Sequence, residues 1–265
     1  AAASEQDALY VTVSSADTPV AAVVRTITMD GLTSKGSDYA VPNNVSAKTL
    51  AINGLSEGDD VNLYVYPSQQ ADVTVSWTDG TGTKNTNQQT LEANRVSVID
   101  LGSVPKSATG LTISATEPVT AAAKVTNDGD GDQADFALVN ASVPMNVSAI
   151  AVPDHATAQV SVTNTSDDDR TATLTSYNGD GDIVEQSDLT IRAGASTTIE
   201  LADINDGDVA AVSLADPDQS MVWNIRVSQK DVSDAKLAGV SVIGATDLKE
   251  AREQVWSNQN MTIVR

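Results

Sequence analysis

Apolar and polar residues alternate along many short stretches of the chain, which is the pattern of β-strands with one buried face. Val and Thr, which strands favour, fill these stretches. Turn residues such as those at 79–82 and 178–181 separate them. The clearest apolar positions are Leu9, Val11, Val13; Val61, Leu63, Val65; Val73, Val75, Trp77; Leu111, Ile113, Ala115; and Trp223, Ile225, Val227. We therefore expect an all-β protein.

One stretch has a helical pattern instead. Between Thr246 and Trp256 the apolar residues Leu248, Ala251 and Val255 would share one face, and Asp247 precedes them as a candidate cap. We expect a short helix here, which Trp256 would dock on the sheets.

The strand pattern repeats at a fixed distance. Pro19, Pro118 and Pro217 are separated by 99 residues each. Further pairs share this offset: Val20 with Val119, Val61 with Val160, Gly80 with Gly179, and Gly82 with Gly181. Because several turn and strand positions agree on one offset, the sequence predicts a repeated module of about 99 residues.

This repeat divides the chain into four parts. Residues 1–45 would form a partial module (a terminal hairpin and a linking strand), and residues 46–155 a first complete module with its linking strand. Residues 156–228 would form a second module. Residues 229–265 would hold a linking segment, the short helix and the final strand of another partial module. The partial modules either belong to a longer array or pair with each other.

The number of strands in a module favours one fold. We expect strands near 46–52, 61–66, 72–78, 88–92, 95–101, 109–115 and 119–126. Such a set of short antiparallel strands is typical of an immunoglobulin-like β-sandwich. The alternative is a β-propeller with blades of about 50 residues, because hairpins begin near 9, 61, 111, 158 and 210. The sequence agrees better at 99 residues than at 50, so we prefer tandem sandwich modules.

Charge and composition exclude several classes of function. The chain has 36 acidic and 15 basic residues, a net charge of −21, which disfavours binding to nucleic acids or anionic lipids. It has no cysteine, so disulfides, thiol catalysis and Cys-ligated metals are excluded. Aromatic residues make up only 3%, which predicts small aliphatic cores. No apolar run approaches the ~18 residues of a membrane span.

One acidic turn is the best candidate for a metal site. Asp128, Asp130 and Asp132 alternate with other residues, and such carboxylates can wrap a Ca²⁺ ion, with Asp135 as a further ligand. An EF-hand loop is excluded, because Gln133 stands where that loop needs glycine. A solvated turn is the simpler interpretation. We expect no other cofactor.

The candidates for catalysis are weak. His155 is the only histidine and lies beside Asp154 in a polar junction between modules. A Ser-His-Asp site would need it, but no nucleophile motif accompanies it, so an exposed linker residue is the simpler interpretation. We assign no catalytic residues and expect no enzyme.

The aromatic residues suggest cores more than ligand sites. Trp77 and Trp223 fall on the buried phase of their strands. Tyr64 and Tyr66 fall on the opposite phase, where they would either form an exposed strip that could bind a sugar or lie beneath the linking segment. We slightly prefer the covered arrangement.

Three segments of the second module carry a resemblance. Residues 160–166 read VSVTNTS, residues 171–181 read TATLTSYNGDG, and residues 191–201 read IRAGASTTIEL. This succession resembles bacterial immunoglobulin-like modules of the cell-adhesion-related type. Residues 91–101 of the first module follow the same pattern, with Asn94 in place of the glycine.

The layout also resembles an uncharacterised actinobacterial family of large secreted or membrane-anchored proteins. Those repeat a sandwich, a strand that begins Pro-Val and contains a basic residue, and a strand that begins Asp-aromatic-Ala. Here these are residues 19–25 and 118–124, and residues 38–40 and 135–137. The third copy departs from the pattern at Pro217-Asp218-Gln219 and at Asp234-Ala235-Lys236. The resemblance implies an exported envelope protein and carries over no catalytic residues.

These observations lead to one expectation of function. We expect a non-enzymatic, exported repeat protein that acts as a structural spacer or interaction module at the bacterial cell envelope, with a cell-surface protein or a glycan as partner. The alternatives are a carbohydrate-binding accessory module and a calcium-stabilised adhesin.

Overall fold

The computed structural model describes residues 10–14, 16, 20, 22–78, 84–104, 108–126, 135–153, 157–204, 208–229 and 239–248. Apart from Leu248, which is helical, their regular structure consists of strands and one 3₁₀ turn, Leu201–Asp203. The expected all-β class is therefore confirmed. The propeller alternative is wrong, because strands that would belong to two successive blades of about 50 residues join in one sheet. The strands do not form radial four-stranded blades.

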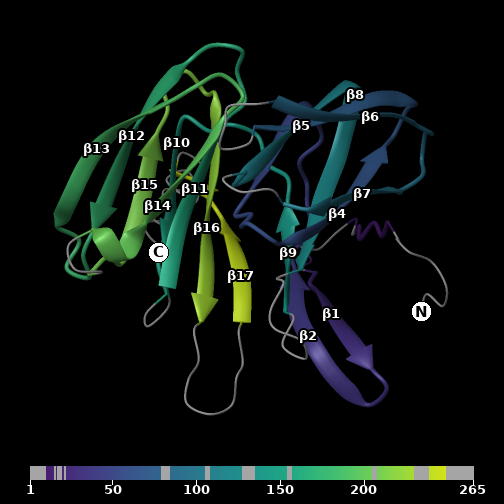
Figure 1. The fold of residues 1–265 in the computed structure, drawn as a ribbon, viewed down its shortest axis with the longest axis horizontal. Coiled ribbons are helices and arrows are strands. Elements are labelled where there is room, and N and C mark those ends of the chain that lie inside the picture. Colours follow the sequence, from purple (N-terminus) through teal and green to yellow (C-terminus); the bar gives the residue numbers. More distant parts are fainter. Residues whose placement is uncertain are drawn as a thin grey trace, which may run out of the picture.

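A two-stranded hairpin precedes the larger sheets. It consists of β1 (Val24–Asp30) and β2 (Thr33–Ala40), which are antiparallel. Figure 1 shows this purple hairpin projecting from the rest of the molecule.

The first half of the molecule, residues 47–141, is one seven-stranded sheet. Its strands are β3 (Ala47–Asn53), β4 (Asp60–Pro67), β5 (Ala71–Thr78), β6 (Lys84–Leu91), β7 (Ser97–Ser103), β8 (Gly110–Thr126) and β9 (Phe136–Asn140). The long strand β8 pairs with β3 and β5 in its first part and with β4 and β9 in its last part. Leu50, Leu63, Val75 and Ile99 from four of these strands meet in one core.

The second half, residues 147–244, is a sandwich of two separate sheets. Its strands are β10 (Val147–Ala151), β11 (Thr157–Asn164), β12 (Arg170–Tyr177), β13 (Ile183–Ile191), β14 (Ser196–Glu200), β15 (Ala211–Ala215), β16 (Met221–Gln229) and β17 (Gly239–Gly244). One sheet has the order β13-β12-β15-β10, extended by β18 (Thr246–Asp247), and the other has the order β14-β11-β16-β17. Val160, Leu174, Val212 and Trp223 fill the core between them.

The strands of the two halves pair in corresponding order. In the first half β6-β5-β8-β3 matches β13-β12-β15-β10, and β7-β4-β8-β9 matches β14-β11-β16-β17. The difference lies in β8, which is continuous where β15 and β16 are separate. The two strands expected at 109–115 and 119–126 are therefore a single strand.

The helix expected over Thr246–Trp256 begins later than predicted, because Leu248 is its first helical residue. Thr246 and Asp247 form β18, which pairs with Ala149 and Ser148 of β10. β10 offers backbone partners to these two residues, and Asp247, the candidate cap, directly precedes the helical Leu248. The remainder of that segment, including Trp256, lies outside the described residues, as does the strand expected at 260–263. In the described part of the chain, no helix is long and apolar enough to cross a membrane.

Candidate functional site

The two halves meet through a buried ion pair. Arg226 lies on the outward face of β16, and Asp59 lies in the loop before β4. The guanidinium donates from Nη1 to Asp59 Oδ2 at 2.6 Å and from Nη2 to Oδ1 at 3.1 Å. Arg226 is 7% exposed and Asp59 is 1% exposed. A two-pronged contact of this kind fixes orientation as well as distance.

The carboxyl of Asp59 is held from several sides. The amide of Ser56 donates to Oδ2 at 2.8 Å, and the amide of Val104 donates to the backbone carbonyl of Asp59 at 2.8 Å. Burial raises the pKa of the Asp59 carboxyl, and the Arg226 guanidinium and the Ser56 amide only partly offset that effect. The charged form of Asp59 therefore depends on its donors, Arg226 and the Ser56 amide, remaining in contact with it.

Glycine is required beside the ion pair. The carbonyl of Gly54 accepts a second bond from Arg226 Nη1 at 2.7 Å, and its φ of +80° lies in the left-handed region. A Cβ atom at this position would lie 3.0 Å from two methyl carbons of Val242 on β17. The sequence at this turn thus permits the close approach of the halves.

A polar cluster extends the contact to β3 and β11. Asn53 donates from Nδ2 to the carbonyl of Val222 at 2.8 Å, and its Oδ1 accepts from Thr163 Oγ1. The hydroxyls of Thr163 and Ser196 are 2.7 Å apart. Gly110 lies against this cluster, where a Cβ atom would overlap the side-chain oxygens of Asn53 and Thr163. These buried polar groups satisfy one another across the interface.

The segments that the sequence marked as linking strands also join successive parts. Asp38 of β2 accepts from the amide of Leu138 of β9 at 2.6 Å. Asp135, just before β9, accepts from the amide of Val240 of β17 at 3.0 Å. The same type of contact, a carboxylate on the backbone of the next linking strand, thus occurs twice. One Asp135 oxygen, suggested above as a calcium ligand, serves this contact.

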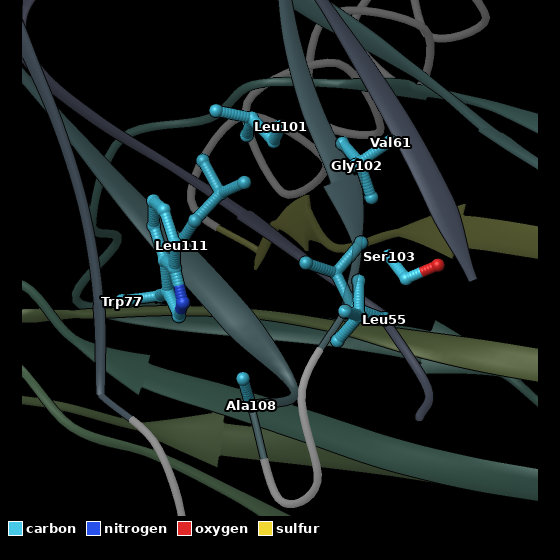
Figure 2. A pocket seen from close by; sticks show the side chains of 9 residues that line it. Leu55, Val61, Trp77, Leu101, Gly102, Ser103, Ala108 and Leu111 are labelled. Atoms are coloured by element: carbon cyan, nitrogen blue, oxygen red, sulfur yellow. The ribbon is translucent and has the colours of Figure 1, made fainter. Parts of the chain in front are cut away.

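The first half contains a small apolar hollow that is partly open to solvent. Figure 2 shows Trp77 and Leu111 on one side of it and Leu55 and Ser103 on the other. The remaining lining residues are Val61, Leu101, Gly102, Val104 and Ala108. The lining is almost wholly aliphatic, so it offers no charged group for chemistry.

The predictions for the aromatic residues are confirmed in part. Trp223 is buried, and its indole N–H donates to Ser148 Oγ at 2.6 Å. Trp77 is only half-buried, because it faces the hollow. Tyr66 is half-buried beneath Tyr10, whose ring stacks on it with centroids 3.9 Å apart. The cover over Tyr66 thus comes from the segment before the hairpin.

The other predicted site residues lie outside the described residues. These are Asp128, Asp130, Asp132 and His155. The calcium hypothesis for the acidic turn therefore stays a prediction. Among the residues that the structure does describe, no group of three or more His, Asp or Glu side chains could hold a metal ion.

Sequence reasoning missed the ion pair. Val222, Asn224 and Arg226 lie on the outward face of β16. Val222 makes this face less polar than the face of a strand that is exposed to water. That signal could have indicated a covered face. Nothing in the sequence indicated Asp59 as its partner, since the two residues are 167 positions apart.

Comparisons with known proteins show the family. The family model described as "Family of unknown function (DUF5719)" matches residues 1–202. No curated protein matches the sequence. Among solved structures, a protein of Parabacteroides distasonis titled "putative secreted protein" has 11% sequence identity and a TM-score of 0.18, over 85% of this chain and 87% of that chain. With so low a TM-score, the match carries no argument about fold or function.

Proposed function

The chain belongs to the DUF5719 family, and from this premise we propose that it is a non-enzymatic structural segment of an exported protein. It would act as a stiff spacer or interaction module at the bacterial cell envelope. Its two halves would be immunoglobulin-like modules of one repeat of about 99 residues. The corresponding strand order of the halves supports this arrangement.

The observation that carries the proposal is the contact between Arg226 and Asp59. A spacer must resist bending, and two sandwiches joined by a flexible linker would bend freely. A buried ion pair with bidentate geometry, extended by the cluster around Asn53, has few alternative arrangements of similar energy. Removing one partner would leave the other charge unpaired within the closed contact, so such a variant should favour separation of the halves.

Distance measurement between the halves tests this proposal. The chain has no cysteine, so spin labels can be placed on Gln88→Cys of β6 and Glu185→Cys of β13, both exposed. Double electron–electron resonance should give one narrow distance distribution. Adding Arg226→Ala should broaden it. Arg192→Ala, which removes an exposed arginine of the second half, should leave it narrow.

The contrary result is equally clear. A broad distribution in the otherwise unaltered chain would show that the halves move independently, and the spacer proposal would fall. A narrow distribution that Arg226→Ala leaves unchanged would remove the ion pair as its cause.

The proposed location rests on the resemblance of the sequence to a family of exported envelope proteins. In intact cells of the organism that encodes the chain, protease added from outside should digest it. A cytoplasmic protein of known location serves as the control. Survival of the chain until the cells are lysed would contradict an exported position.

A further inference from the structure

The β1–β2 hairpin has the same pairing as the β8–β9 hairpin of the first half. Adding 99 to both members of each pair converts one register into the other. Val24↔Ala40, Arg25↔Tyr39 and Thr26↔Asp38 thereby become Ala123↔Val139, Lys124↔Leu138 and Val125↔Ala137. Each hairpin also places a basic side chain over an aromatic ring, Arg25 over Tyr39 and Lys124 over Phe136. The two hairpins are built alike.

Their outer edges differ. Between Val119 and Thr126, β8 pairs with β9 on one edge and with β4 on the other. The β4 pairing is antiparallel and runs from Pro67↔Val119 to Asp60↔Thr126. In the described part of the chain, β1 pairs with β2 alone. Among the described residues, no strand pairs with the edge of β1 that corresponds to the β4 edge of β8.

Apolar side chains of β1 and of the residues just before it are exposed on this face. Val20 and Val24 are both 57% exposed, whereas Val119 and Ala123, their counterparts 99 residues later, are fully buried. An open strand edge with apolar side chains is a template for pairing with another strand. Proteins that keep such an edge free usually protect it with charges or proline, and the side chain of Val24 offers neither.

We propose that this edge of β1 binds a β-strand of another polypeptide, antiparallel, with the apolar alternation of β4. The bound strand would take the place that Asp60–Pro67 takes beside β8, so that an aliphatic residue of it faces Val24 as Leu63 faces Ala123. Main-chain hydrogen bonds would supply affinity, and the alternate side chains would supply selectivity. The hairpin is thereby an attachment point for a partner with an alternating aliphatic strand.

A peptide with the β4 sequence tests this site on the full chain. The probe is a fluorescent peptide of residues 60–67, DVNLYVYP, and the control is the equally long β6 peptide of residues 84–91, KNTNQQTL, which is mostly polar. The first should give saturable fluorescence anisotropy. At saturation it should slow hydrogen exchange of the β1 amides by about tenfold or more. The β6 peptide should do neither.

Two adjacent substitutions locate the binding. Val24→Asp places a carboxylate opposite the aliphatic residue of the bound strand and should weaken binding more than about tenfold. Val23→Asp changes a valine of similar exposure, 60%, on the opposite face and should weaken it less than about threefold. Circular dichroism would show that both variants keep the strand content of the unaltered chain.

Three results would overturn the proposal. The β4 peptide could fail to bind, it could bind without protecting β1, or it could bind equally well to the Val24→Asp variant. Sedimentation of the chain alone covers a further case. A dimer that Val24→Asp dissociates, without binding of the peptide, would make a second copy of the chain the occupant instead.

Discussion

The two halves of the molecule pair their strands in corresponding order. They differ at the corner, the place where the chain passes from one strand layer to the other. In the first half β8 runs through the corner and serves both layers, so one sheet forms the whole half. In the second half β15 ends at Ala215 and β16 begins at Met221. The carboxylate of Asp216 accepts from the amides of Ser220 and Met221, each at 2.6 Å, and Gln219 has a φ of 50°. The buried carboxylate of Asp216 thus closes a turn between β15 and β16, at the place where β8 of the first half only bends.

The cores of the halves differ in a compensating way. In the second half the large Trp223 packs with the small Ser148. The strand pairings place Ala123 and Leu50 at the corresponding positions of the first half, and both are buried. Size is exchanged between facing positions, as expected where two sheets share a fixed separation. The second half thus fills its core at this place with one large and one small side chain, and the first half exchanges their positions.

The largest expected effect concerns the contact that joins the halves. Arg226→Ala leaves Asp59 buried and unpaired and should lower the free energy of unfolding by about 3–5 kcal/mol. Urea denaturation measures it. Arg192→Ala should change stability by less than about 0.5 kcal/mol. The double variant Asp59→Leu with Arg226→Met should be much less destabilised than Arg226→Ala alone, because no charge is left buried. Equal losses would show that packing, not charge, holds the halves.

The next largest effect separates the two cores. Trp223→Phe removes the donor to Ser148 Oγ and some volume, and should cost about 2–4 kcal/mol. Trp77→Phe affects a half-buried ring at the hollow and should cost less than about 1 kcal/mol. Urea denaturation of both variants makes the comparison. Similar losses would contradict the assignment of a filled core to one half and an open hollow to the other.

The corner of the second half gives a smaller effect. Asp216→Ala leaves two buried amides without an acceptor and should cost about 1–3 kcal/mol. Asp218, two residues later, is exposed and forms only a 3.7 Å contact with Arg170, so Asp218→Ala should cost about 0–1 kcal/mol. Thermal unfolding would measure both. A neutral Asp216→Ala would show that the carboxylate is not what ends the strand.

The smallest effect is a dependence on pH. Because burial raises the pKa of Asp59 in the folded chain above its ordinary value of 3.8, the folded state holds this proton more tightly than the unfolded state does. The stability that Asp59 contributes is full below pH 3.8 and declines as pH rises towards its folded pKa. The stability of the unaltered chain relative to Asp59→Asn should therefore fall across that range and level off above it. Urea titrations of both proteins at several pH values test the sign, and a rise would contradict it.

Sequence patterns predicted the strands well where one face of a strand is buried. The alternation at Val61, Leu63 and Val65 predicted a strand over 61–66, and the structure has β4 over Asp60–Pro67. The corners were harder to predict, since a proline, Pro118 or Pro217, stands at the same repeat position in both. Pro118 lies within β8 at a shift of register with β3, whereas Pro217 lies in a turn closed by Asp216. The residue before each proline distinguishes them: Asp216 accepts from the amides of Ser220 and Met221, whereas Glu117 stands at the corresponding place before Pro118.

The contact between the halves was beyond sequence reasoning for a different reason. Arg226 and Asp59 meet only because whole sheets are placed against one another, and no periodicity relates their positions. The acidic turn at 128–132 was visible in the sequence, and melting temperature with Ca²⁺ and with a chelator would test it, because a ligand that binds only the folded state must stabilise it.

The distance along the chain between Asp59 and Arg226, 167 residues, also orders the events of folding. All strands of the first sheet lie between Ala47 and Asn140, so that half can form on the ribosome before Arg226 has been synthesised. Until then, the carboxyl of Asp59 would remain hydrated at the edge of a finished half. Docking of the halves through this pair can thus begin only after β16 has been synthesised, and a chain that stops short of β16 would keep a water-accessible carboxylate at that edge.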